Sequence, residues 1–288
     1  MSHTYKKQKQ PDYGAGLDAP PPYYDAVPNA APGWNPADDA PSYKHAVAGG
    51  PSSPRTLVAA TAKFPPAFNC YLQWAFTRTC HLGPSADEKL FAASLRTSLR
   101  NQREVIVFDG PSDKDPVLIK MEKKWTSTMY KPTKITMPAR PERGERVPYE
   151  TEMTGIPFSF DQSTARTFMV EVGGKGTDME PRAEEFQWRY SHAEEVKQLA
   201  GWGYGWKLVW LSGSRSEGAG GRRGERDRGF TSDGHEVVAV LASGKGMTEA
   251  AKFAFVGTGL TGILGERWEA TAVATAIWTW YANVEGES

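Results

Sequence analysis

Three glycines toward the carboxyl end have the spacing of a dinucleotide-binding turn. Gly257, Gly259 and Gly262 follow the strand-like run "KFAFV" and precede a helix-like segment. In a dinucleotide site that helix leads into a second parallel strand, whose end carries an acidic residue that holds the ribose. The 288-residue chain ends 26 residues after Gly262, which leaves room for the helix alone. We therefore interpret the glycines as a sharp turn from strand to helix, and expect no cofactor.

The residue types that usually carry catalysis are scattered along the chain. None of the five histidines lies in an H-E-x-x-H pattern, and neither G-x-S-x-G nor C-x-x-C occurs. Asp109, Asp113 and Asp115 in "DGPSDKD" are oxygen ligands without EF-hand spacing, which is typical of a polar hairpin turn. We expect neither catalytic residues nor a metal site; an enzyme with an unrecognised pocket is the least favoured alternative.

Two cysteines lie in "FNCYLQWAFTRTCHLG", where large apolar side chains alternate as in a strand. If Cys70 and Cys80 share one strand, about 33 Å separates their sulfurs, far beyond disulfide reach. A metal site that adds His81 would lack C-x-x-C spacing. We expect free thiols in a reducing compartment.

The most specific short motif lies near the amino end. "APPPYYDAV" contains P-P-x-Y twice in overlap, ending at Tyr23 and at Tyr24. Consecutive prolines favour a polyproline II helix, which docks into the aromatic groove of a WW domain at low entropic cost. Such matches also arise by chance in proline-rich segments. The predicted partner is a WW-domain protein, for example a ubiquitin ligase, and the predicted contacts are Pro20, Pro21, Pro22, Tyr23 and Tyr24.

A second candidate is a basic segment between Lys120 and Arg146, where eight Lys and Arg residues face three glutamates. Such a segment could bind an anionic lipid, or could be only a solvated loop. The lysines proposed as lipid contacts are Lys120, Lys123, Lys124, Lys131 and Lys134. Over the whole chain, 34 basic and 34 acidic residues balance, so no global charge favours nucleic acid.

The elements that must position these residues are mostly short strands. Residues 1–55 hold ten of the 21 prolines and no lasting period, which predicts a disordered tail before a folded domain over 56–288. Strand-like runs are "KLFAASLRTS", "EVIVFDG", "DPVLIKME", "GIPFSFD", "TFMVEVGG", "EEFQWRYS", "GWKLVWLSG", "HEVVAVLAS" and "KFAFVG". "SHAEEVKQLAG" predicts a short surface helix, with Ser191 and Glu194 as a capping box and Gly201 as its end.

The segment over residues 266–283 predicts a different kind of helix. After Glu269 no charge follows until Glu285, and apolar side chains cover every face. Such a helix is buried in a large core or in a membrane, and 13 residues from Ala270 to Ala282 are too few to span a bilayer. Its many alanines suit a helix enclosed by strands. We therefore expect a mainly β (α+β) fold, an antiparallel β-barrel wrapped around this helix.

This layout resembles the tubby C-terminal-like superfamily, which includes tubby, LURP-one-related proteins and phospholipid scramblases. The resemblance rests on "LFAASL", "EVIVFDG", "DPVLIKME", "KFAFVGTG" and "WEATAVATAIWTWY", and covers most of residues 60–288. "FQWRYSHAEEVKQLAGWGYGWKLVWL" with the C-terminal segment also resembles fungal proteins of this type. The resemblance implies a helix-filled barrel and, from tubby itself, binding of phosphoinositides, although no lipid-contacting position can be matched. Scramblase activity would require a longer apolar segment.

The sequence thus favours a non-enzymatic binding or adaptor protein whose tail recruits a WW-domain partner. The alternative is a peripheral membrane protein that binds anionic lipid or phosphoinositides through a basic edge. No signal peptide and no run of 18 apolar residues is evident. We expect a cytoplasmic protein with no transmembrane segment, with the nucleus or the membrane periphery as alternative locations.

Overall fold

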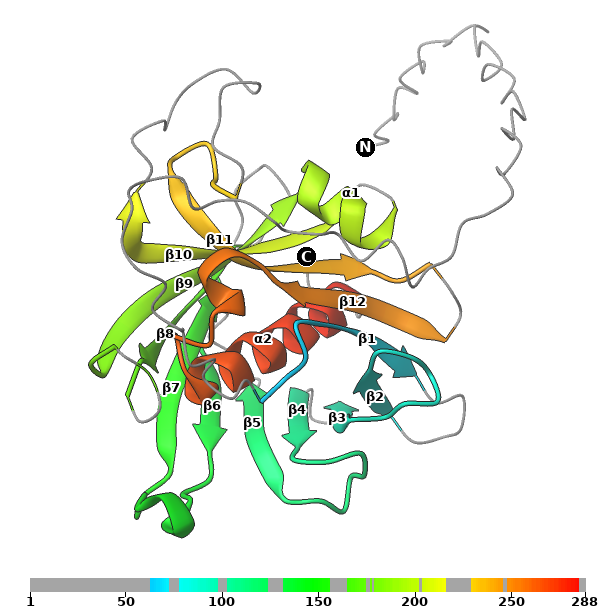
Figure 1. Ribbon diagram of the computed structural model, residues 1–288. Helices are drawn as coiled ribbons and strands as arrows, with labels where there is room; N and C mark the ends of the chain where they lie inside the picture. Colours follow the sequence, from blue (N-terminus) through cyan, green and yellow to red (C-terminus); the bar gives the residue numbers. More distant parts are fainter. Residues whose placement is uncertain are drawn as a thin grey trace, which may run out of the picture. The chain divides into compact units, whose positions relative to one another are not determined.

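Twelve antiparallel strands close into one barrel around a C-terminal helix (Figure 1). The computed structural model describes residues 63–72, 78–97, 103–123, 132–155, 165–174, 177, 179–201, 204–215, 229–245 and 248–284. The strands are β1 (Ala67–Leu72), β2 (Thr79–Gly83), β3 (Phe91–Thr97), β4 (Arg103–Phe108), β5 (Val117–Lys123), β6 (Thr133–Met137), β7 (Tyr149–Gly155), β8 (Arg166–Val172), β9 (Arg182–Ser191), β10 (Gly205–Arg215), β11 (His235–Ser243) and β12 (Glu249–Phe255). The helical elements are η1 (Pro141–Arg143), α1 (Glu194–Ala200), η2 (Gly257–Leu260) and α2 (Glu266–Val284).

The barrel follows chain order, because each strand pairs with its neighbours in sequence and β1 pairs with β12 to close it. This topology confirms the predicted fold class. A barrel of eight strands can fill its interior with strand side chains alone, whereas a wider one needs another filling. Here α2 supplies that filling.

The helix α2 is buried on all sides. Every residue from Trp268 to Ala282 is buried, and α2 contacts β4, β5, β8 and β11. Strands β5 and β11 lie on opposite sides of the closed order, so the helix must run through the middle (Figure 1). The predicted buried helix is confirmed.

The helix α2 also carries a buried stripe of hydroxyl groups that the sequence analysis missed. Thr271, Thr275 and Thr279 recur every four residues, and each is fully buried. The Trp188 indole N–H, on β9, donates to the Thr275 hydroxyl at 3.0 Å, and that hydroxyl donates to the Thr271 carbonyl at 2.7 Å. Because hydrogen bonds are directional, these two linked hydrogen bonds fix the rotation of the helix inside the barrel.

The carboxylate of Glu269 joins the helix to the first described residues. It accepts the backbone N–H groups of Lys63 at 2.8 Å and of Phe64 at 3.3 Å. Burial raises the pKa of Glu269, against the opposing effect of these two hydrogen bonds. Phe64 then packs on Phe91, with ring centroids 4.4 Å apart, which covers this end of the core.

The glycine triad forms the predicted turn between β12 and α2. Gly257 has φ of 52° and Gly262 has φ of 72°, backbone conformations that favour glycine. A Cβ on Gly259 would lie 2.2 Å from the Val238 carbonyl oxygen and 2.9 Å from the Trp268 ring. Every strand pairing among the described residues is antiparallel, so these glycines do not begin a parallel βαβ unit.

One local prediction needs correction, two strands were missed, and one predicted strand falls outside the described residues. The cap of α1 is Ala193 and not Ser191, which ends β9 and accepts the Ala193 N–H at 3.2 Å; Gly201 ends the helix as predicted, with φ of 70°. Strands β6 and β7 were not predicted, because β7 ("YETEMTG") is polar and buries Met153 alone. The predicted strand "GIPFSFD" lies outside the described residues beyond Gly155.

The cysteine prediction was also partly wrong. The chain turns between Cys70 and Cys80, which lie on the paired strands β1 and β2, with Leu82 opposite Cys70 and Leu72 opposite Cys80. Both thiols are free, as predicted, but they contact one another in the core. Their hydrogen bond and their burial raise the pKa of Cys70 well above its usual value.

We predict that Thr275→Val destabilises the fold by about 1–3 kcal/mol, because it leaves the Trp188 N–H buried without an acceptor. In the Trp188→Phe background the same change should cost much less, since no N–H is then orphaned. Urea unfolding of the four proteins in this double-mutant cycle measures the coupling.

Thr279→Val is the matched control, since the Thr279 hydroxyl is equally buried and makes no hydrogen bond to any described residue. It should be neutral or stabilising. Equal losses for Thr275→Val and Thr279→Val, or strict additivity in the cycle, would contradict the proposed role of Thr275.

Candidate functional site

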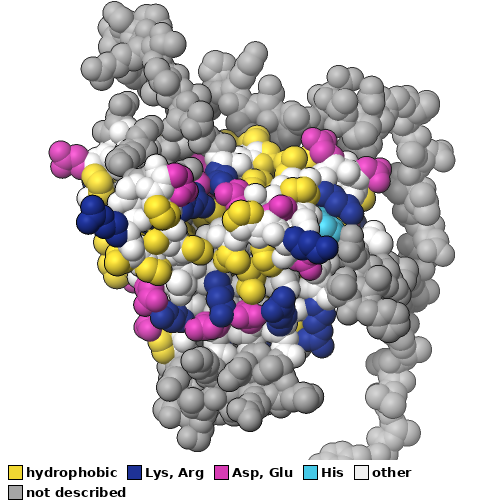
Figure 2. Space-filling model, turned by 90° about the horizontal axis from the view of Figure 1, so that it is seen from below, with side chains coloured by type: hydrophobic (Ala, Val, Ile, Leu, Met, Phe, Trp, Pro, Cys, Tyr) yellow, Lys and Arg dark blue, Asp and Glu magenta, His cyan; other side chains and the backbone are white. Residues whose placement is uncertain are grey.

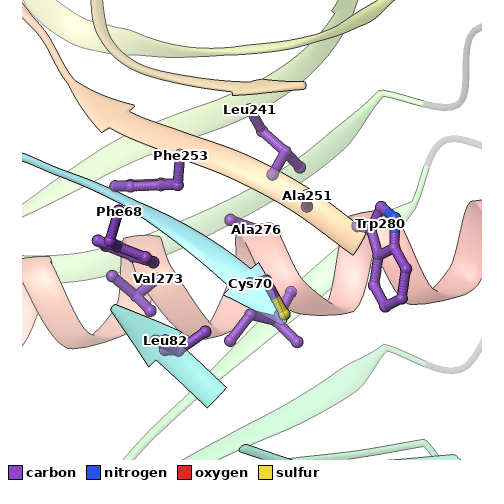
Figure 3. Close-up of a pocket in the computed structure, with 10 residues that line it drawn as sticks. Phe68, Cys70, Leu82, Leu241, Ala251, Phe253, Val273, Ala276 and Trp280 are labelled. Carbon is purple, nitrogen blue, oxygen red and sulfur yellow. The ribbon is translucent and has the colours of Figure 1, made fainter. Parts of the chain in front are cut away.

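The barrel interior leaves almost no free space. Figure 3 shows the residual cavity beside the middle of α2, lined by residues such as Phe68, Cys70 and Trp280. Its volume is about 10 Å³ and its lining is apolar, so it is the size of one water molecule and too small for a ligand.

A larger hollow lies at the barrel end where α2 begins. Its volume is about 380 Å³, within the range of small-ligand pockets. We call it the N-end hollow; it is lined by Leu118, Met137, Pro138, Arg140, Gly144, Glu145, Tyr149, Glu171, Gly173, Gly174, Pro181, Gly265, Glu266, Arg267 and Ala270. These residues come from strands β5 to β8, the β6–β7 and β8–β9 connections, Gly265 and the first turns of α2.

Arg267 is the central group of the N-end hollow. Its Nη2 donates to Glu145 at 2.8 Å and its Nη1 donates to Glu171. The guanidinium carbon lies 4.4 Å from the centre of the Tyr149 ring, a cation–π geometry. One side chain of α2 thus links the β6–β7 connection, β7 and β8.

A second set of ion pairs lies beside the first. Arg140 contacts Glu266 at 2.5 Å, and Lys63 contacts the same carboxylate at 3.4 Å and Asp109 at 2.6 Å. Glu266 and Glu269 occupy the first turn of α2, where the positive end of the helix dipole favours carboxylates. The first turn of α2 therefore already carries its own anions.

At the opposite barrel end, where α2 stops, several described residues are basic. Arg103 lies over the Tyr281 ring at 5.3 Å, and Arg78 donates to the Tyr281 hydroxyl at 3.5 Å. Lys123 stands directly opposite Arg103 across the β4–β5 pairing, so the two share the inner face. Arg166 is opposite Trp188, which bonds to α2, so Arg166 also lies on the inner face. We call Arg78, Arg103, Lys123 and Arg166 the basic rim.

The predicted lipid-binding lysines divide between different environments. Lys120 contacts Glu104 at 2.8 Å and Glu122 at 2.9 Å, and hydrogen bonds to these carboxylates raise its pKa. Lys134 contacts Glu150 at 2.7 Å, which raises its pKa likewise. Basic and acidic side chains also intermingle on the face shown in Figure 2. Of the predicted lysines that the structure describes, Lys123 alone belongs to the basic rim.

The remaining predicted contacts fall outside the described residues. These are Lys124 and Lys131, and the motif residues Pro20, Pro21, Pro22, Tyr23 and Tyr24. Sequence reasoning missed the residues that the fold does bring together, because they are far apart in the chain. One sequence signal could have identified two of them, because alternate residues of a strand face the same side. Arg103 alternates with Val105 and Val107, and Arg166 alternates with Phe168 and Val170, so each basic residue faces the same side as buried apolar ones.

His81 is a buried histidine without a hydrogen-bond partner on either ring nitrogen among the described residues. Burial lowers its pKa, and Lys89 acts in the same direction; the nearby Pro111 carbonyl and Asp113 oppose this only in part. The neutral ring is therefore the form compatible with the fold. Within the described part of the chain, no three His, Cys, Asp or Glu side chains form a group that could hold a metal ion.

Comparison with known proteins gives no relative from which a function could be transferred: no family model, no curated protein and no solved structure matches this chain. The functional argument therefore rests on the chain's own residues. Of the helices in the described residues, none is both long and apolar enough to cross a membrane.

We predict that stability falls as the pH drops from about 7 to about 5, in part through His81. Its folded pKa lies below that of the unfolded chain, so the unfolded state binds the proton more readily as the pH falls. His81→Gln should therefore give a shallower dependence of unfolding free energy on pH. The difference between the two proteins at pH 8 reports packing alone and serves as the control. An unchanged slope in His81→Gln would show that His81 does not contribute.

Proposed function

We propose that this protein is a non-enzymatic binding or adaptor protein. The observation that carries the proposal is the filled barrel: α2 occupies the interior, and the residual cavity holds no more than one water molecule. Contacts with other molecules must then be made by the barrel ends, the outer surface and the segments that precede the barrel.

We also propose that the barrel is of the tubby C-terminal-like type. Support comes from the closed antiparallel order of twelve strands and from a C-terminal helix buried on all sides. Filled barrels with a central helix also occur in unrelated proteins, so this proposal concerns the architecture and carries no lipid-binding residue with it.

In this proposal the partner-recruiting element is the proline–tyrosine motif at residues 20–24. Its support is chemical: two overlapping P-P-x-Y sequences offer either Tyr23 or Tyr24 to the tyrosine pocket of a WW domain. A WW domain of a ubiquitin ligase is a partner of the expected kind. Binding of the WW domain to this motif would then bring the partner protein close to the barrel domain.

We predict that Tyr23→Ala or Tyr24→Ala alone weakens binding to a WW domain, and that the double variant abolishes it, because either tyrosine can complete the motif. Pull-down of the full chain by immobilised WW domains, followed by titration of the bound domain, provides the measurement.

Tyr43→Ala is the control, a tyrosine in the same proline-rich region that follows no proline pair. Undiminished capture of the Tyr23→Ala/Tyr24→Ala variant would overturn the WW-ligand proposal.

The second candidate function is binding of an anionic lipid surface. The observation that favours it is the basic rim, whose inner-face Arg103, Lys123 and Arg166 gather around the last turns of α2. The outer-face lysines Lys120 and Lys134 support it less, since they lie outside the basic rim. Attraction of this kind weakens with added salt.

On this alternative, Lys123→Gln should reduce sedimentation with vesicles of phosphatidylcholine containing phosphatidylserine or a phosphoinositide, and added salt should reduce it further. Lys134→Gln is the matched control, because Lys134 is a lysine on the outer face of the neighbouring strand β6 and lies outside the basic rim. No sedimentation at low salt, or equal losses in both variants, would contradict a contact through the basic rim.

A further inference from the structure

The N-end hollow has a polarity that identifies the kind of ligand it can take. Three carboxylates line it, from Glu145, Glu171 and Glu266, against the two guanidinium groups of Arg140 and Arg267. Two of the carboxylates are also the most accessible of these groups: the side chains of Glu171 and Glu145 are 43% and 35% exposed, against 25% for Arg267, 22% for Glu266 and 19% for Arg140. A ligand entering the hollow therefore meets the carboxylates of Glu171 and Glu145 first.

The backbone hydrogen-bond donors around the hollow are already used. The backbone N–H groups of its glycines all bond to backbone carbonyls: Gly144 to Pro141, Gly173 to Leu264, Gly174 to Met179 and Gly265 to Gly262. Arg140 donates to Glu266, and Arg267 donates to Glu145 and Glu171. Both guanidinium groups keep further N–H groups, but an anion that accepted from them would lie beside the carboxylates with which these arginines already pair, and the like charges would repel it.

Acceptors, in contrast, remain available. Arg267 takes Oε1 of Glu145 and Oε1 of Glu171, and the second oxygen of each carboxylate bonds to no other described residue. Tyr149 supplies an aromatic ring at the same place, already in cation–π contact with Arg267. Carboxylate oxygens beside an aromatic ring are the groups that recognise an organic cation.

We propose that the N-end hollow binds a guanidinium or ammonium group, carried by an Arg or Lys side chain of a partner protein or by a free organic cation. The ligand's N–H groups bond to the free oxygens of Glu145 and Glu171, next to the Tyr149 ring. Apolar Leu118, Met137 and Ala270 in the lining would contact the aliphatic part of the side chain. This extends the proposed binding function by naming what one end of the barrel recognises.

Calorimetric titration of the full chain tests the proposal with four probes: N-acetyl-arginine amide, a capped Gly-Gly-Arg-Gly-Gly peptide, its counterpart with Gln in place of Arg, and inorganic phosphate. The Arg peptide should bind and the Gln peptide should not. Glu145→Gln and Glu171→Gln should each weaken binding about tenfold, as expected for loss of one charge-assisted hydrogen bond. Each single variant leaves Arg267 one carboxylate, and thermal unfolding verifies that the fold is retained.

Glu150→Gln is the matched control, since Glu150 pairs with Lys134 outside the hollow, and it should bind like the wild type. Tighter binding of the peptide than of the capped amino acid identifies a protein segment as the ligand, whereas equal binding identifies a free cation; both support the proposal. Equal binding of the Gln peptide, no binding of either arginine probe, or phosphate binding that Arg140→Gln abolishes would overturn it. A negative result in this titration would not affect the pull-down by WW domains, so the two proposals can be refuted independently.

Discussion

The width of a closed twelve-strand barrel is the constraint on which the rest of the structure depends. The side chains of so many strands cannot meet at the axis, so a cylinder of space must be filled by something else. The helix α2 fits because small residues such as Ala272, Ala274 and Ala276 let the strands approach, while Trp268, Trp278 and Trp280 reach outward into wider gaps. The helix must also satisfy buried polar groups, which explains why Thr271 and Thr275 bond to the backbone and Thr275 accepts the Trp188 N–H.

Filling the barrel determines where function can reside. The interior is packed with apolar side chains that stabilise the fold, and charged side chains lie near the first and last turns of α2. Glu266 and Glu269 lie in the first turn of α2, and Arg78 and Arg103 contact Tyr281 near its end, as the helix dipole favours. The two ends of the helix therefore have different surroundings, one with paired charges and spare carboxylate oxygens and one with basic side chains from the strands.

The sequence predicted what local periodicity and composition control. Alternating apolar positions in β3, β4, β5, β8, β9, β10, β11 and β12, and the apolar surface of α2, were sufficient to predict the strands, the barrel and its central helix. Polar β7 carried too weak a pattern, and Cys70 and Cys80 were assigned to one strand because nothing in their apolar alternation marks the turn between them. The N-end hollow was beyond prediction: Glu145, Glu171 and Arg267 meet only because β7, β8 and α2 converge in space. Ion pairs of this kind leave no periodic signature in a sequence.

The place of α2 after the last strand has a consequence for biosynthesis. Strand β1 must pair with β12, which is more than a hundred residues away, and Glu269 must reach back to Lys63 and Phe64. While the ribosome is still translating, the strands that have already emerged have neither the partner that closes the barrel nor the helix that covers their inner faces. The nascent chain therefore exposes apolar strand surface until α2 leaves the exit tunnel, and the long separation of the closing strands makes folding of the barrel slow. Chaperones that hold exposed β-strands would act on this protein chiefly in that interval.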